Sequence, residues 1–140
     1  MIDSNDFPYL SPTNHRITSP QDGDYNCIAW SFQDNSRWWE PGYYWPSSFH
    51  HGDYGIATLI KLFQDAGFVS CETDTVEEGF EKVAVYGSTF LYTHAARQLN
   101  NGMWTSKLGK LEDIEHHTPH DIAGGVYGEV VEIMKREVLK

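Results

Sequence analysis

A change of hydrophobic period halfway along the chain limits the folds that this sequence can adopt. Between about residues 53 and 66, apolar side chains recur at the spacing of one helix face, at Ile56, Leu59, Ile60 and Phe63. Beyond residue 67 the pattern becomes that of short, partly alternating strands, in segments 81–87, 90–99 and 102–109. Helices followed by antiparallel strands predict an α+β domain.

Turn and capping residues set the expected boundaries of these elements. Gly67 is well placed to end the helix before it. The Asn-Asn-Gly run at 100–102 predicts a hairpin turn between the last two strands. A short helix is expected to begin near Asp24 or Asn26, either of which suits an N-cap, and to run to about Gln33. Residues 68–71 predict a further edge strand.

The chain length of 140 residues suits one domain. We expect three parts within 1–140: an irregular N-terminal arm over 1–23, a helical half over 24–67 and a sheet half over 68–140. The helical half contains an aromatic loop at 37–49, in which two prolines and a glycine interrupt five Trp and Tyr side chains. The final segment, from Tyr127, fits helical spacing and also fits a strand to about Met134.

The acidic composition excludes several classes of partner. A formal net charge of -10 opposes binding to nucleic acid or to anionic lipid, since both need Lys and Arg. The first residues show no signal peptide and no run is long enough to span a bilayer. Cys27 and Cys71 are too few for a disulfide framework, so free thiols in the cytoplasm are expected, with a Cys27–Cys71 bridge as the minor alternative. The sequence does not fix the oligomeric state.

Cys27 lies where a polar turn meets an apolar run, at the expected start of a helix, where the pKa of a thiol is lowered. A cysteine nucleophile also needs a base and a group that orients that base. His94 stands in an expected strand and suits the base. Asp113 is the first choice for the third residue, and Ser106 and Glu112 are the alternatives.

Four blocks of sequence carry a resemblance to a known family: "YNCIAW", "HAARQL", "WTSKLG" and "DIEH". Together they resemble an uncharacterised bacterial domain family over roughly residues 15–136. The order of Cys27, His94 and a later polar residue is distantly similar to papain-like cysteine hydrolases. That likeness implies a papain-like α+β fold, in which a Cys-bearing helix packs on a C-terminal antiparallel sheet. Gln21, six residues before Cys27, matches the spacing of an oxyanion-hole glutamine.

The leading hypothesis is therefore a papain-like, thiol-protease-like cysteine hydrolase that cleaves an amide, ester or isopeptide bond without a cofactor. Its substrate would be a peptide, a protein or a small amide. In this hypothesis Cys27 attacks the carbonyl, His94 accepts the thiol proton, Asp113 orients His94 and Gln21 stabilises the oxyanion. The expected substrate-binding residues are aromatic: Trp30, Trp39, Tyr44 and Trp104.

Two alternatives remain open. The chain could be a non-catalytic module that binds a protein or a glycan through its Trp- and Tyr-rich loop. Alternatively, His94, Asp113 and His116 could hold a metal ion for hydrolysis, since imidazole and carboxylate suit zinc, although their spacing matches no strong motif.

Overall fold

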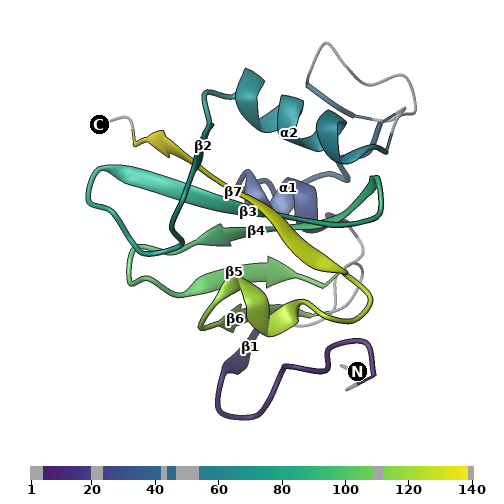
Figure 1. Ribbon diagram of the computed structural model, residues 1–140, viewed down its shortest axis with the longest axis vertical. Helices are drawn as coiled ribbons and strands as arrows, with labels where there is room; N and C mark the ends of the chain where they lie inside the picture. The colour runs from purple at the N-terminus through teal and green to yellow at the C-terminus, as the bar shows by residue number, and fades with distance from the viewer. Residues whose placement is uncertain (1–4, 20–23, 42–43, 47–53, 109–111, 139–140) are drawn as a thin grey trace.

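The structure is a computed structural model that describes residues 5–19, 24–41, 44–46, 54–108 and 112–138. Its centre is a seven-stranded antiparallel sheet with the strand order β1-β6-β5-β4-β3-β7-β2 (Figure 1). The elements are β1 His15–Ser19, α1 Cys27–Ser31, α2 Ile56–Asp65, β2 Val69–Cys71, β3 Phe80–Ser88, β4 Leu91–Gln98, β5 Trp104–Lys107, β6 Asp113–His116, the 3-10 helix η1 Pro119–Ile122 and β7 Glu129–Glu137.

The described chain is mainly β, so the prediction of a papain-like α+β fold is wrong. The helices α1 and α2 contain only 5 and 10 residues. Three segments that were expected to be irregular or ambiguous instead join the sheet. β1 comes from the N-terminal arm, β6 from the segment 112–120, which contains three histidines, and β7 from the C-terminal segment. The C-terminal segment is a strand rather than a helix because it pairs with both β3 and β2.

Several local predictions are confirmed. Asn26 caps α1, because its side chain accepts a hydrogen bond from the backbone N–H of Ala29 at 3.1 Å. Gly67 follows α2 with a φ of +99°, as a glycine beyond a helix end commonly does. Residues 69–71 form an edge strand, and the hairpin turn between β4 and β5 places Gly102 at a φ of +87°.

The sheet separates two apolar clusters. Helix α1 packs on β4 and β5, and α2 packs on β3 and β4, on the face that we call the helix face. The opposite face is covered by η1, the loop after it and the N-terminal segment around Phe7. Alternation along a strand sends consecutive side chains to opposite faces. Accordingly, Val85 belongs to the helix-face cluster and its neighbour Tyr86 to the other.

The hairpin between β3 and β4 contains a strained residue. Ser88 pairs with Leu91, which leaves Thr89 and Phe90 as a two-residue loop. Thr89 has a φ of +58°, a region that two-residue hairpins require but that β-branched side chains rarely adopt. The tight loop therefore holds Thr89 in a backbone conformation that is unfavourable by about 1–3 kcal/mol.

Replacing Thr89 with glycine should increase the free energy of unfolding by about 1 kcal/mol, because glycine adopts a positive φ without a steric cost. Urea denaturation of the two proteins measures this difference. The control is Ser88→Gly, at a neighbouring exposed position with negative φ, which should lower stability instead. Equal effects of the two substitutions would contradict the strained loop.

Candidate functional site

Strand β4 places the predicted base and the predicted nucleophile on different faces of the sheet. His94 pairs with Tyr86, and the two rings meet edge to face at 5.1 Å. The next residue, Ala95, belongs to the helix-face cluster together with Cys27. Because consecutive strand residues point to opposite faces, His94 points away from α1. The predicted Cys27–His94 dyad is not formed.

Cys27 is a buried thiol at the first residue of α1. Burial raises its pKa to about 11. Hydrogen bonding from the backbone of Ala95 and the positive charge of Lys107 act in the opposite direction, but they do not offset burial. Since the thiolate is the nucleophilic form, this environment holds Cys27 in its unreactive state near neutral pH.

His94 is fully buried among aromatic rings on the opposite face. Its ring stacks on Tyr127 with centroids 4.0 Å apart. Neither ring nitrogen has a hydrogen-bond partner among the described residues. Burial holds the pKa of His94 well below its ordinary value, and the nearby His116 acts in the same direction. His94 is therefore a neutral core residue in this structure.

Asp113 lies on the helix face, in a buried polar cluster that also includes Ser19 of β1, Tyr25 just before α1 and Lys107 of β5. Its carboxylate accepts hydrogen bonds from the hydroxyl groups of Tyr25, at 2.6 Å, and Ser19. The ammonium group of Lys107 lies 4.0 Å from the other carboxylate oxygen. Asp113 therefore binds Tyr25 and Lys107 and does not orient His94, contrary to the sequence prediction. Three of the four sequence blocks that carry the family resemblance meet at this cluster.

Ser106 and His116 form a separate pair on the face of His94. The Ser106 hydroxyl lies 2.8 Å from Nε2 of His116, and Nδ1 of His116 lies 2.8 Å from the carbonyl oxygen of Thr118. Both residues are fully buried. Within the described ranges, no group of three or more His, Cys, Asp or Glu side chains is placed to hold a metal. The metal alternative fails because Asp113 and His116 point to opposite faces.

The predicted substrate-binding aromatics do not form one site, although Tyr44 packs edge to face on Trp39 with ring centroids 5.2 Å apart. Trp104 is buried in the cluster opposite α1, and Trp39 is buried in the helix-face cluster with its indole N–H bonded to Asp34. Trp30 is half-buried and donates its indole N–H to Thr105. Tyr44 is exposed, but the structure does not bring it together with Trp104. Gln21 lies outside the described residues.

An exposed apolar group at the tip of the β3–β4 hairpin was not recognised from the sequence. We call it the aromatic surface; it consists of Tyr54, Phe90 and Leu91, which are 38%, 80% and 56% exposed and are brought together by the bridge between Gly55 and Leu91. The ring of Tyr54 stacks on Tyr92, and Tyr92 stacks on Trp45, with ring centroids 5.9 Å apart in each pair. The available signal was the "TFL" run at 89–91, in which apolar residues follow a turn position.

The fold and this surface define a mainly-β domain with a short cysteine-bearing helix on one face of an antiparallel sheet. A family model described as "Domain of unknown function (DUF7689)" matches residues 16–135, and the chain belongs to this family. The match confirms the resemblance to an uncharacterised domain family; it does not bear on bacterial origin or on a likeness to papain-like enzymes. No curated protein and no solved structure matches the chain. None of the described helices is long and apolar enough to cross a bilayer.

In the native protein, iodoacetamide should alkylate the half-buried Cys71 at least about tenfold faster than Cys27, because burial keeps Cys27 protonated and inaccessible. Mass spectrometry of the modified peptides, sampled over time at pH 7.5, measures both rates. The same reaction in urea is the control and should remove most of the difference. Faster labelling of Cys27 in the native protein would restore the nucleophile hypothesis.

The two buried histidines should make the protein less stable in acid. In the unfolded chain both bind a proton below their ordinary pKa of 6.5, whereas burial lowers the folded pKa of His116 to about 4 and that of His94 well below 6.5. The contribution of the two histidines to the free energy of unfolding is therefore complete above pH 6.5. It falls below that pH by about 1.4 kcal/mol per pH unit for each histidine.

Urea denaturation between pH 7.5 and 5.5 measures this slope. His94→Phe should keep the stacking on Tyr127, break no hydrogen bond and roughly halve the loss of stability over this range. His120→Phe, at an exposed position, is the control and should leave the slope unchanged. An unchanged slope in His94→Phe would show that His94 is not held neutral in the folded protein.

Proposed function

We propose that this chain is a non-catalytic module that binds a protein partner through the aromatic surface. The observation that carries the proposal is the 80% exposure of Phe90 at the tip of a two-residue hairpin, next to the 56% exposed Leu91. Contiguous exposed apolar side chains on a folded domain commonly mark interaction sites. Aromatic side chains also dominate the energy of protein interfaces.

The backbone around Phe90 is fixed by hydrogen bonds to the segment that precedes α2. The Phe90 carbonyl accepts from the N–H of Ile56 at 2.8 Å, and the N–H of Tyr92 donates to the carbonyl of Tyr54 at 3.0 Å. A bridge also pairs Gly55 with Leu91. A surface that is already ordered loses little conformational entropy on binding, which favours affinity.

The chemistry of the surface favours a protein over a glycan. Phe90 and Leu91 carry no side-chain group that can hydrogen-bond to a sugar hydroxyl. The carboxylate of Glu40, which contacts Tyr54, already accepts hydrogen bonds from Tyr54 at 2.6 Å and Trp38 at 3.0 Å. An apolar side chain of a partner protein therefore suits Phe90 and Leu91 better than a hydroxyl-rich ligand.

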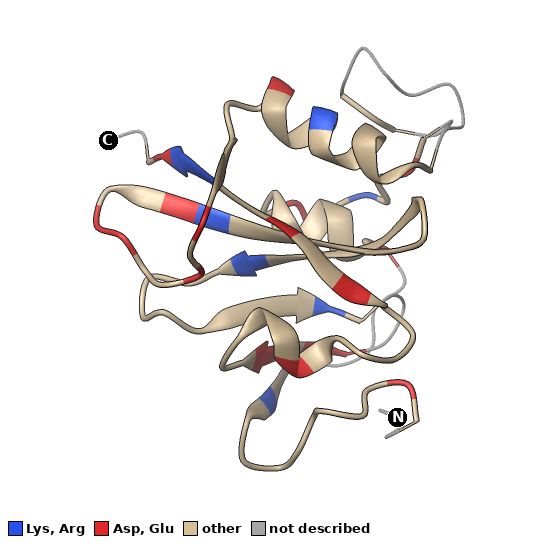
Figure 2. Ribbon diagram, viewed as in Figure 1, with Lys and Arg blue, Asp and Glu red and all other residues tan. Residues whose placement is uncertain are grey.

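The charge of the chain favours a basic partner. The net charge is -10, and Figure 2 shows acidic residues on α2, β3, β6, η1 and β7 and in the loops. The exposed Glu129 begins β7 and pairs with Gly87, two residues before the hairpin loop. Opposite charge at the rim of an interface mainly raises the association rate and makes it depend on salt. We therefore expect a partner with an apolar centre and Lys or Arg around it.

Hydrolysis of a substrate by a cysteine nucleophile has no comparable geometric support. Cys27 and His94 point to different faces of the sheet, and the pKa of Cys27 is raised rather than lowered. Catalysis by Cys27 would need a base on the helix face. Lys107, whose charge acts on Cys27, is paired with Asp113.

The test compares proteins captured from a native lysate by the wild type, by the double variant Phe90→Ser/Leu91→Ser, and by the control Val69→Ser/Val126→Ser. The control removes two exposed valines, 59% and 54% accessible, outside the aromatic surface. Loss of Phe90 and Leu91 should weaken capture of a specific protein by about 2 kcal/mol or more, roughly thirtyfold. The control should capture that protein as the wild type does, and added salt should weaken both equally.

The urea midpoints of all three proteins establish that each is folded, since the four replaced side chains are exposed. Capture that does not distinguish the two double variants would contradict the proposal, and so would the absence of any specific protein. Self-association through Phe90, detected by analytical ultracentrifugation, would assign the surface to a second copy of the chain and overturn the heterologous partner.

A further inference from the structure

We propose that Arg97 is the centre of a pocket that binds a carboxylate group of a small ligand or of a peptide C-terminus. The pocket lies near the end of β4 that is remote from Phe90 and Leu91, so the inference is independent of the aromatic surface. Its volume is about 250 Å³. The lining residues are Gln33, Glu81, Arg97, Gln98, Leu99, Asn100 and Val138.

Arg97 is a partly buried cation that forms no ion pair of its own; the nearby Glu81, whose charge acts on it, is paired with Arg136. Its guanidinium lies over the indole ring of Trp30, with Cζ 5.7 Å from the ring centroid. No ion pair or side-chain hydrogen bond joins it to another described residue, and its Nε is buried without a partner. Arginine stays protonated even when burial lowers its pKa. An anion that entered the pocket would satisfy both the charge and the N–H groups.

Gln33 is a second residue of the pocket with side-chain donors. It follows α1 in the left-handed region, with a φ of +62°, where glycine or asparagine is usually favoured. Its backbone N–H bonds to the carbonyl of Trp30 at 2.9 Å. The side chain is exposed and lines the pocket. The side-chain amide of Gln33 can therefore donate a hydrogen bond to an anion in the pocket.

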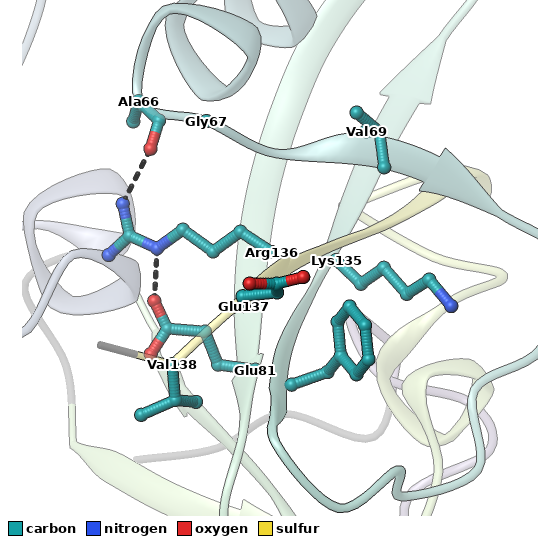
Figure 3. Close-up of a pocket in the computed structure, with 9 residues that line it drawn as sticks. Ala66, Gly67, Val69, Glu81, Lys135, Arg136, Glu137 and Val138 are labelled. Atoms are coloured by element: carbon teal, nitrogen blue, oxygen red, sulfur yellow. Dashed lines mark hydrogen bonds and ion pairs between the residues drawn. The ribbon is translucent and has the colours of Figure 1, made fainter. Parts of the chain in front are cut away.

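The one carboxylate that lines the pocket is already neutralised. Glu81 forms an ion pair with Nε of Arg136, whose Nη1 also donates to the carbonyl of Ala66 at 2.8 Å. Figure 3, a close-up of the neighbouring pocket that Glu81 and Val138 also line, shows the Arg136 guanidinium between these two acceptors. Because Arg136 is occupied in this way, the unbalanced charge in the pocket is the single positive charge of Arg97.

The charge and size of the pocket favour a carboxylate over a phosphate. One unpaired guanidinium matches the charge of one carboxylate, and its planar donors match carboxylate geometry in a bidentate pair. A dianionic phosphate would leave one negative charge uncompensated near Glu81, in a chain whose net charge is -10. A volume of about 250 Å³ accommodates a group about the size of one amino acid residue.

The test is an NMR titration that follows the Nε–H resonance of Arg97 and the side-chain amide of Gln33. The probes are acetate, trialanine with a free C-terminus, trialanine amide and inorganic phosphate. Acetate and trialanine should shift both resonances saturably, whereas trialanine amide should not. Tighter binding of trialanine than of acetate assigns the site to a peptide C-terminus; equal binding assigns it to a small acid.

Three variants test the role of each side chain. Arg97→Gln should weaken binding about tenfold or more, since a hydrogen-bonded charge is lost. Gln33→Gly should weaken binding severalfold, and Arg97→Lys should weaken it by less than Arg97→Gln does. These two variants test the proposal if Arg97→Gln does not fold. Lys61→Gln removes a cation that is paired with Asp65 on α2, and it should change nothing. Equal binding by Arg97→Gln or Gln33→Gly, equal binding of the amide, or tighter binding of phosphate would overturn the proposal.

Discussion

The alternation of side chains along β4 is the constraint on which the rest of the structure depends. This strand carries His94 toward Tyr86 and Tyr127 and turns Ala95 toward α1. A shift of one residue in its register would exchange the two faces and bring an imidazole to Cys27. The pairing of β3 with both β4 and β7 fixes that register, because each partner buries apolar residues on both faces.

Each face then builds its own polar chemistry within a buried layer. On the helix face, Asp113 accepts a hydrogen bond from the hydroxyl of Tyr25 and pairs with the ammonium of Lys107. On the other face, Ser106 bonds to His116, while His94 is left without a hydrogen bond among the described residues. Buried polar networks of this kind specify the packing more than they add stability. The residues that we propose as ligand-binding lie instead at the two ends of β4, at Phe90 and Leu91 and at Arg97.

The sequence predicted the local elements better than the architecture. Asn26 and Gly67 correctly indicated where helices begin and end, because capping depends on residues only a few positions apart in the sequence. The strands β1 and β6 were missed because their polar residues lack an alternating pattern, and only pairing with each other and with β5 makes them strands. The site residues Cys27 and His94 were chosen for their chemistry, and sequence order could not give the face on which His94 lies. Phe90 was missed because the exposure of an apolar residue depends on the tertiary fold.

The most direct test of the separation between the two faces is a nuclear Overhauser measurement on the ring protons of His94. The structure predicts cross-peaks from this ring to the rings of Tyr86 and Tyr127, and none to the β-protons of Cys27. A cross-peak between His94 and the Cys27 β-protons, with none to Tyr127, would contradict the account and place the imidazole beside the thiol.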